Sequence, residues 1–191
     1  GAFSHIVLRS VLDKYQYLPK QDRAFMTRLV DGTIEYMLQL DYIIDSFSKT
    51  KVKKMKPFIR NLLRMSVYQI KYMDAVPDSA VCNEAVKLAK RHRFAQLSGF
   101  VNGVLRNIAR NIDSVELDTL SIRYSMPQWI VDRFVAAYGS EKAEEIFKAF
   151  HSKSAISIRT NLTRCAPDEL RTMLEEEGVT VTPVDELDYA F

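Results

Sequence analysis

The chain has 191 residues, which is enough for one complete domain and part of a second, because domains usually contain about 100–150 residues. With 47% hydrophobic residues, six Gly, six Pro and no low-complexity tract, the composition excludes a disordered protein and predicts a packed core. The net charge of +3 is unevenly distributed: residues 1–111 contain 19 Lys and Arg against 9 Asp and Glu, and residues 112–191 contain 8 against 15. A polyanion would therefore bind mainly to the first part.

Residues 3–110 predict an all-α bundle, because apolar residues recur at helical spacing almost throughout. Helices are expected at residues 3–15, 24–47, 57–72, 77–91 and 94–110. The clearest pattern is that of the third expected helix, which begins at Pro57 and has Ile59, Leu63 and Val67 on one face. The long second stretch is expected to bend at Gly32.

After residue 111 the pattern becomes mixed. Residues 111–119 are rich in acidic and turn-forming residues and are predicted to be a linker, and two helices should follow, separated at Gly139. Strands are expected at 156–159 and 179–181, on either side of a helix that begins at Pro167. We therefore expect two domains, 1–111 and 120–191, the second being a small, incomplete α+β segment of a longer protein.

Basic residues recur in several groups along the first domain. On the 57–72 helix, Arg60, Arg64 and Lys71 lie within about 40° of one another at 3.6 residues per turn. The full set expected to contact RNA is Lys53, Lys54, Lys56, Arg60, Arg64, Lys71, Lys87, Lys90, Arg91, Arg93, Arg106 and Arg110. Any one group is equally well explained as an ordinary solvated face, but together, with few acids nearby, they favour RNA binding.

Aromatic side chains lie among these groups. Tyr15, Tyr17, His92 and Phe94 are candidates to stack on unpaired bases, as in modules that bind single-stranded RNA. The alternative is that most of these side chains belong to the hydrophobic core.

Two glycines, Gly99 and Gly103, stand at i and i+4 within the last predicted helix of the bundle, where each costs about 1 kcal/mol relative to Ala. We expect them to allow another backbone to pack closely against the helix. Asn102 should then bond a buried backbone group or pair with Asn83. A ligand site is the alternative explanation.

Residues for catalysis or metal binding are scarce. The three histidines have no acidic or cysteine neighbours at metal-ligand spacing, so no metal site is expected. Cys82 and Cys165 form no CxxC pair, which argues against a disulfide framework and favours the reducing cytoplasm. No glycine-rich nucleotide loop or GxSxG sequence occurs, and no apolar run approaches the roughly 20 residues that cross a bilayer. We therefore expect neither a catalytic site nor a membrane span.

Several segments resemble a known domain. The first domain contains DRAF at 22–25, LVDGT at 29–33, PFIRNLLRMSVYQI at 57–70, VPDSAVCNEAVKLAK at 76–90 and GFVNGVLRNIAR at 99–110. In order and spacing these resemble the NusB-like helical domain. That domain occurs alone, as a transcription antitermination factor, and as the N-terminal RNA-binding part of the Sun, Fmu or RsmB family of ribosomal-RNA methyltransferases. YSMPQWIVDRFVAAYG at 124–139 and SIRTNLTRCAPDELRTMLEEEGV at 157–179 resemble the segment that leads to the methyltransferase core, which favours the enzyme family.

This resemblance implies methylation of cytosine C5 in 16S ribosomal RNA from S-adenosylmethionine, through a covalent cysteine adduct on the base. It implies two partners, the rRNA and a methyltransferase domain in the same polypeptide. Neither Cys82 nor Cys165 lies in the family's Pro-Cys or Thr-Cys context, and the glycine-rich cofactor loop is missing, so this part should be inactive by itself and bind no cofactor. Two alternatives stay open: an antitermination-type adaptor without catalysis, and a bundle that forms a weak dimer and has an incidental basic face.

Overall fold

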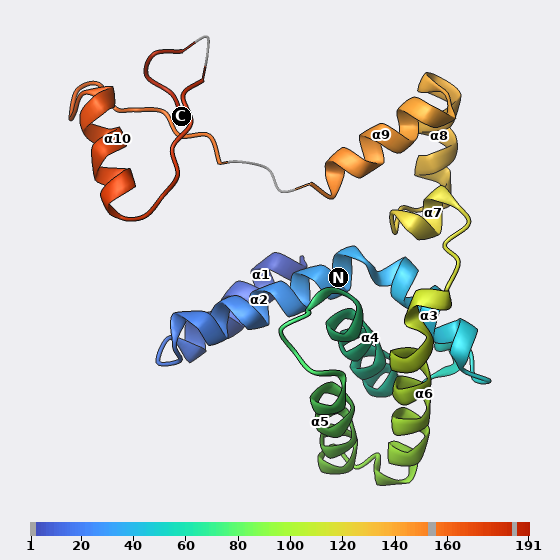
Figure 1. Ribbon diagram of the computed structural model, residues 1–191. Coiled ribbons are helices and arrows are strands. Elements are labelled where there is room, and N and C mark those ends of the chain that lie inside the picture. Colours follow the sequence, from blue (N-terminus) through green and yellow to red (C-terminus); the bar gives the residue numbers. More distant parts are fainter. Residues whose placement is uncertain (1–2, 153–155, 185–186) are drawn as a thin grey trace. The chain divides into compact units, whose positions relative to one another are not determined.

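The computed structural model describes residues 3–152, 156–184 and 187–191, and the regular structure in them is helical (Figure 1). The chain divides into two compact units, residues 1–150 and 151–191. The helices of the first unit are α1 (Ser4–Leu12), α2 (Lys20–Glu35), α3 (Met37–Phe47), α4 (Pro57–Tyr72), α5 (Asp78–Arg91), α6 (Ser98–Asn111), α7 (Leu120–Arg123), α8 (Gln128–Tyr138) and α9 (Ser140–Phe150). Short 3₁₀ turns η1 to η4 cover Asp13–Tyr15, Val52–Lys54, Ala95–Leu97 and Ile112–Ser114. The predicted all-α fold is confirmed, and no described helix is long and apolar enough to span a membrane.

The core of the first unit surrounds α4, which packs against α2, α3, α5 and α6. Its predicted apolar face is the buried one, since Ile59, Leu63 and Val67 are at most 1% exposed. They join Leu40 of α3 and Leu105 of α6 in one hydrophobic cluster. Each buried side chain of this size stabilises the fold by about 1.5–3 kcal/mol. This face therefore holds α4 at the centre of the bundle.

The break between α2 and α3 falls at Tyr36 and not at Gly32, as the sequence had suggested. Gly32 is buried within α2, where the ring of Tyr68 from α4 occupies the space that a β-carbon would need. Tyr68 is held there by the rings of Tyr36 and Tyr72, whose centroids lie 6.2 and 5.3 Å from its own. Glycine is thus required at position 32 for the close approach of two helices, and not for a bend.

A buried polar residue of α3, Gln39, joins the bundle to α7. Its side chain is 1% exposed, and its amide Nε2 donates to the carbonyl oxygens of Ile122 and Arg123 at 3.1 and 2.9 Å. Its Oε1 accepts a hydrogen bond from the hydroxyl of Tyr72 at the end of α4. Burial raises the pKa of the Tyr72 hydroxyl above its ordinary value, so this group stays protonated and donates a hydrogen bond to Gln39. Three helices therefore meet through one amide.

The helices after α7 form a small second core. Ala143 and Phe147 of α9 are fully buried and pack with Val131 of α8. The two helices are joined at Gly139, whose φ of +79° fits the predicted helix end. Because α7 packs on α3, the predicted linker at 111–119 lies inside the first compact unit.

The second unit contains α10 (Pro167–Glu176) and a short antiparallel pairing. Ile158 and Phe191 exchange backbone hydrogen bonds of 2.7 and 2.9 Å, and the Thr160 N–H donates to the Tyr189 carbonyl at 2.8 Å. The strand expected at 179–181 is not formed, because within the described ranges residues 158–160 pair with residues 189–191 instead. The alternation of apolar residues predicted the extended backbone near residue 158 but not the segment that pairs with it, because strand pairing depends on the tertiary structure.

The expectation that Gly99 and Gly103 allow close helix packing is wrong. Both are exposed on α6, and a β-carbon at either position would meet no atom within 4 Å. Among the residues that the structure describes, the side chains of Asn83 and Asn102 form no hydrogen bond with a buried group or with each other. This part of α6 presents bare backbone to the solvent.

Replacing Gln39 by Leu should lower the free energy of unfolding by about 2–4 kcal/mol, because the Tyr72 hydroxyl and two carbonyl oxygens lose their partner. Urea unfolding measures this change. Gln69→Leu is the matched control, since the Gln69 amide donates only to the Met65 carbonyl of its own helix, at 3.2 Å, and its loss should cost less than about 0.5 kcal/mol. Equal effects of the two substitutions would contradict the role given to Gln39.

Replacing Gly32 by Ala should destabilise the fold by about 1–3 kcal/mol, because the Tyr68 ring cannot move without disturbing two neighbouring tyrosines. The same substitution at Gly103 should instead stabilise the fold by up to about 1 kcal/mol, through helix propensity in open space. The two variants are compared by thermal and urea unfolding. Stabilisation by Gly32→Ala would refute the close approach.

Candidate nucleic-acid interface

Two segments of the first unit are rich in basic residues and contain no Asp or Glu. Residues 46–73 include eight Lys and Arg, and residues 85–112 include six. The first segment forms η2 and α4, and the second forms the C-terminal half of α5 together with η3 and α6. Because no acid along either segment neutralises this charge, the place where the two segments meet is the strongest candidate for binding an anion.

The fold brings the two segments together through aromatic contacts. Phe58, at the start of α4, stacks on Phe94 with ring centroids 5.3 Å apart and planes 3° from parallel. The Phe58 centroid also lies 4.7 Å from that of His92, which directly follows α5. His92 is exposed, whereas Phe58 and Phe94 are partly buried against the main core. We call these three residues the aromatic step.

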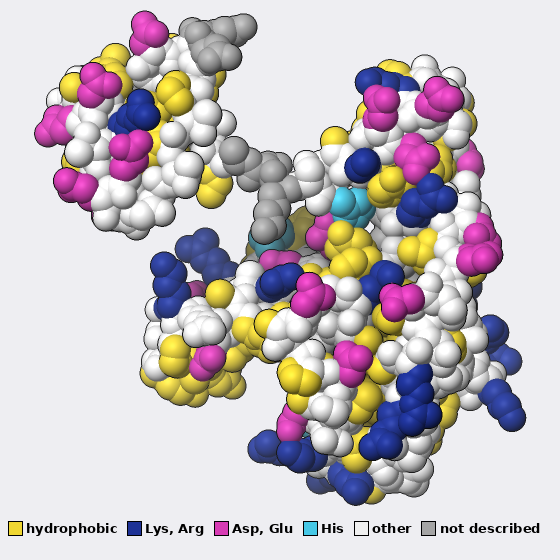
Figure 2. All heavy atoms as spheres, in the orientation of Figure 1, with side chains coloured by type: hydrophobic (Ala, Val, Ile, Leu, Met, Phe, Trp, Pro, Cys, Tyr) yellow, Lys and Arg dark blue, Asp and Glu magenta, His cyan; other side chains and the backbone are white. Residues whose placement is uncertain are grey.

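Eight of the predicted RNA-binding residues lie within five positions of a member of the aromatic step, but Arg60 is partly buried and Lys87 pairs with Glu84. We call the other six the basic rim: Lys53, Lys54, Lys56, Lys90, Arg91 and Arg93. All six are exposed, and none forms an ion pair with any residue in the described parts of the chain. Figure 2 shows Lys and Arg side chains around the end of the bundle where α5 leads into α6, and along α6 itself. The basic rim therefore keeps its charge available to a ligand.

The predicted stripe along α4 is largely engaged within the fold. The guanidinium of Arg64 donates from Nε and Nη2 to the two carboxylate oxygens of Asp41, both at 2.6 Å, and the Arg64 side chain is 14% exposed. Burial lowers the pKa of Lys71, with the nearby charge of Asp113 opposing the shift. Arg60 is partly buried as well. Sequence spacing placed these three residues on one face of the helix, but it could not show that Asp41 of α3 would pair with Arg64 there.

The remaining predicted residues differ from one another in their surroundings. Lys87 pairs with Glu84 at 2.6 Å on the surface of α5. Arg106 and Arg110 are exposed on α6 and continue the side on which Gly99 and Gly103 leave the backbone open. This side of α6 extends from the aromatic step toward the other end of the bundle.

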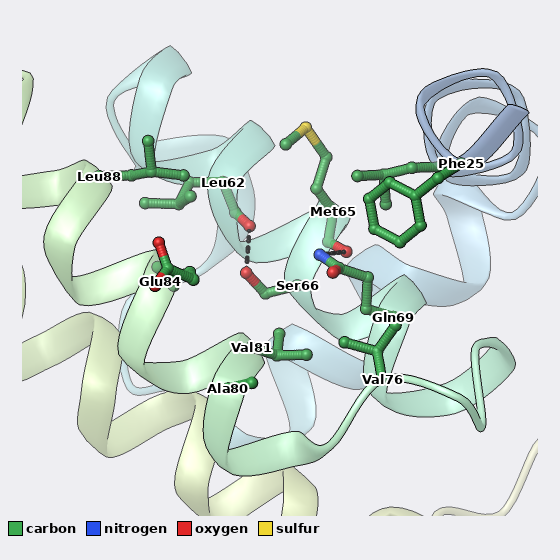
Figure 3. Close-up of a pocket in the computed structure, with 12 residues that line it drawn as sticks. Phe25, Leu62, Met65, Ser66, Gln69, Val76, Ala80, Val81, Glu84 and Leu88 are labelled. Carbon is green, nitrogen blue, oxygen red and sulfur yellow. Dashed lines mark hydrogen bonds between the residues drawn. The ribbon is translucent and has the colours of Figure 1, made fainter. Parts of the chain in front are cut away.

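An apolar groove lies between α2, α4 and α5 and encloses about 340 Å³ (Figure 3). Phe25, Met65 and Leu88 are among the residues that line it. The polar side chains of Ser66 and Gln69 at this groove donate to carbonyl groups of α4 itself. Glu84, which pairs with Lys87, also lines the groove, so the groove offers mainly apolar contact area.

The two cysteines do not form a methyl-transfer centre. Cys82 is 3% exposed, and burial, assisted by Asp78, raises the pKa of its thiol, which is the reverse of what a nucleophile needs. Cys165 is followed directly by the start of α10, where a cofactor-binding loop would need glycines for close backbone approach. The residues present therefore do not fit S-adenosylmethionine. The described residues also contain no group of three or more His, Cys, Asp or Glu able to hold a metal ion.

Comparison with known proteins identifies the family of the first 110 residues. Residues 1–110 match the NusB family. The chain belongs to this family. Residues 126–191 match a second family, described as the ferredoxin-like domain of RsmF/B-like methyltransferases. The NusB-family region is thus followed by a region that matches a domain model of RsmF/B-like methyltransferases.

The relatives of this NusB-family chain are of two kinds. It is 36% identical over 190 residues to the probable ribosomal RNA small subunit methyltransferase B of Bacillus subtilis, and 30% identical over 187 residues to that of Synechocystis. These matches include 96% and 95% of the chain but only 42% of each relative. It is also 40% identical over 97 residues to the transcription antitermination protein NusB of Dictyoglomus thermophilum, a match covering 50% of the chain and 67% of that protein.

Among solved structures, the crystal structure of PH0851 shares the fold. The TM-score is 0.65 at 18% identity, and the match covers 95% of this chain and 42% of PH0851. The chain therefore spans less than half of the methyltransferases and of the solved protein that it resembles.

Replacing Arg64 by Ala should lower the free energy of unfolding by about 1–2 kcal/mol, because the partly buried Asp41 carboxylate loses two short charged hydrogen bonds. Lys87→Ala, which removes an exposed pair, should change it by less than about 0.5 kcal/mol. Chemical unfolding compares the two. If Arg64→Ala leaves stability unchanged, Arg64 is free to serve another role, including ligand binding.

Proposed function

We propose that this chain is the RNA-binding part of an S-adenosylmethionine-dependent rRNA (cytosine-C5) methyltransferase, and that it positions 16S rRNA for a catalytic domain elsewhere in the same polypeptide. The observation that carries the proposal is the meeting of two acid-free basic segments at the aromatic step. The names of the Bacillus subtilis and Synechocystis relatives support the methyltransferase assignment.

Binding would rest on contacts with the RNA backbone. Lys and Arg that neutralise phosphates release counterions, and this supplies most of the affinity of sequence-independent binding. The basic rim has six such side chains without an acidic partner in the described residues, and Arg106 and Arg110 extend the surface along α6. Phosphate contacts of this kind orient the RNA but do not read its sequence. Choice of the target cytosine would then belong to the catalytic domain.

The antitermination adaptor is the second candidate, favoured by the 40% identity to a NusB protein and by the absence of methyl-transfer residues in this part. The two candidates differ in what the whole polypeptide does. With S-adenosylmethionine and 16S rRNA, transfer of a methyl group to cytosine C5 supports the enzyme. RNA binding without any transfer by the whole polypeptide supports the adaptor.

Removing three charges of the basic rim, as Lys56/Lys90/Arg91→Ala, should flatten the dependence of log affinity on log salt by about 2, since each lost phosphate contact contributes roughly 0.7 for single strands. Binding of the chain to 16S rRNA fragments is measured by fluorescence anisotropy across a salt series.

The matched control is Arg133/Lys142/Lys148→Ala, which removes the same charge from exposed positions of α8 and α9. It should leave the slope nearly unchanged. Equal flattening in both variants would mean that only net charge matters, and no binding by the unmodified chain would remove the proposed function.

A further inference from the structure

The aromatic step has one feature that an ordinary charged surface lacks: an exposed ring beside cations. His92 is exposed and rests against Phe58, whose own ring is stacked on the partly buried Phe94. Phe58 and Phe94 pack against the main core, so the support under His92 is rigid. A flat, supported and exposed ring is a suitable surface for stacking a nucleobase.

Arg93, between His92 and Phe94, has a backbone conformation that arginine rarely adopts. Its φ is +67°, in the left-handed region. The N–H of Phe94 donates to the Ala89 carbonyl at 2.9 Å, and that of Arg93 to the Lys90 carbonyl at 3.4 Å. This pair of bonds is the helix-ending arrangement in which glycine normally occupies the left-handed position. The chain keeps a cationic side chain where glycine would be more stable.

The strain at Arg93 lies next to the stacking surface. Non-glycine residues held in this region cost about 1 kcal/mol or more, and such residues are concentrated at ligand-binding sites. Arg93 is exposed and forms no ion pair within the described parts of the chain, so no intramolecular ion pair accounts for an arginine at this position. Its position, one residue from His92, would place a guanidinium beside a base stacked on the imidazole.

We propose that the aromatic step is a binding site for an unpaired nucleotide of RNA, with the base stacked on His92 and the adjoining phosphate held by Arg93 together with Lys90 and Lys56 of the basic rim. This inference rests on the proposed function and deepens it. A base inside a duplex has both faces covered by its neighbours, so the site selects single-stranded or bulged RNA over regular duplex. The basic rim then supplies affinity, and the aromatic step supplies the preference for unpaired nucleotides.

His92→Ala should weaken binding of a single-stranded oligouridine by about 5- to 100-fold, the range found for loss of one stacked base. The salt dependence should stay unchanged, because no charge contact is removed. His92→Tyr, which retains a ring, should restore most of the affinity. Binding of an RNA hairpin with a fully paired stem should change by less than about 2-fold, because a duplex offers no free base face.

Arg93→Gly provides a second and independent measurement. Relief of the left-handed strain should raise the midpoint of thermal unfolding by about 2–4 °C, as expected for about 1 kcal/mol in a chain of this size. The same variant should bind oligouridine several-fold more weakly and with a flatter salt dependence. Arg133→Ala, which removes one exposed charge from α8, is the control. It should leave the affinities for oligouridine and for the RNA hairpin within 2-fold of the unmodified chain.

The outcomes separate this inference from the proposed function. Salt-dependent RNA binding that His92→Ala leaves unchanged would overturn the stacking site while leaving the RNA-binding role intact. Equal weakening of oligouridine and hairpin by His92→Ala would also overturn it, since the residue would then serve the fold or the charge alone. A more stable Arg93→Gly variant that binds RNA normally would remove Arg93 from the site. Absence of any RNA binding by the unmodified chain would overturn the proposed function itself.

Discussion

Burial of one face of α4 is the constraint on which the rest of the first unit depends. Four helices pack on it, and Ile59, Leu63 and Val67 leave almost no surface exposed. The two ends of α4 make different contacts. At one end Phe58 brings the acid-free segments together, and at the other the Tyr72 hydroxyl supports Gln39, which holds α7. A central helix thus connects the candidate RNA surface with the attachment of the segment that leads into the second unit.

The basic residues fall into two classes once the fold is known. Some are engaged by the protein itself, as Arg64 is by Asp41 and Lys87 is by Glu84. Those of the basic rim remain exposed and without an acidic partner in the described residues. A cation that is already paired with a carboxylate at 2.6 Å contributes little to the binding of a phosphate, because that ion pair would first have to break. The electrostatic surface is therefore smaller and more localised than the composition of the first 111 residues suggests.

The second unit exposes several large apolar side chains. Ile156, Leu162 and Met173 are more than half exposed, although they are large and apolar. Its pairing between residues 158–160 and 189–191 involves few hydrogen bonds, and sheets of so few strands are marginal in isolation. Exposed apolar side chains that lie together on a surface are typical of sites that bind another protein surface. The first unit has a larger closed core, although Phe3, Tyr17 and Trp129 are exposed on it as well.

Local periodicity and composition were enough to predict most of the helices, the apolar face of the 57–72 segment, the family resemblance and the uneven charge. They did not determine that Gly32 serves Tyr68, that Gly99 and Gly103 face solvent, or that residues 158–160 pair with residues 189–191. Nor could spacing along α4 reveal Asp41 beside Arg64, or Phe58 beside His92. These features depend on segments that are distant in the chain, because helix packing and strand pairing determine which side chains meet and which stay exposed.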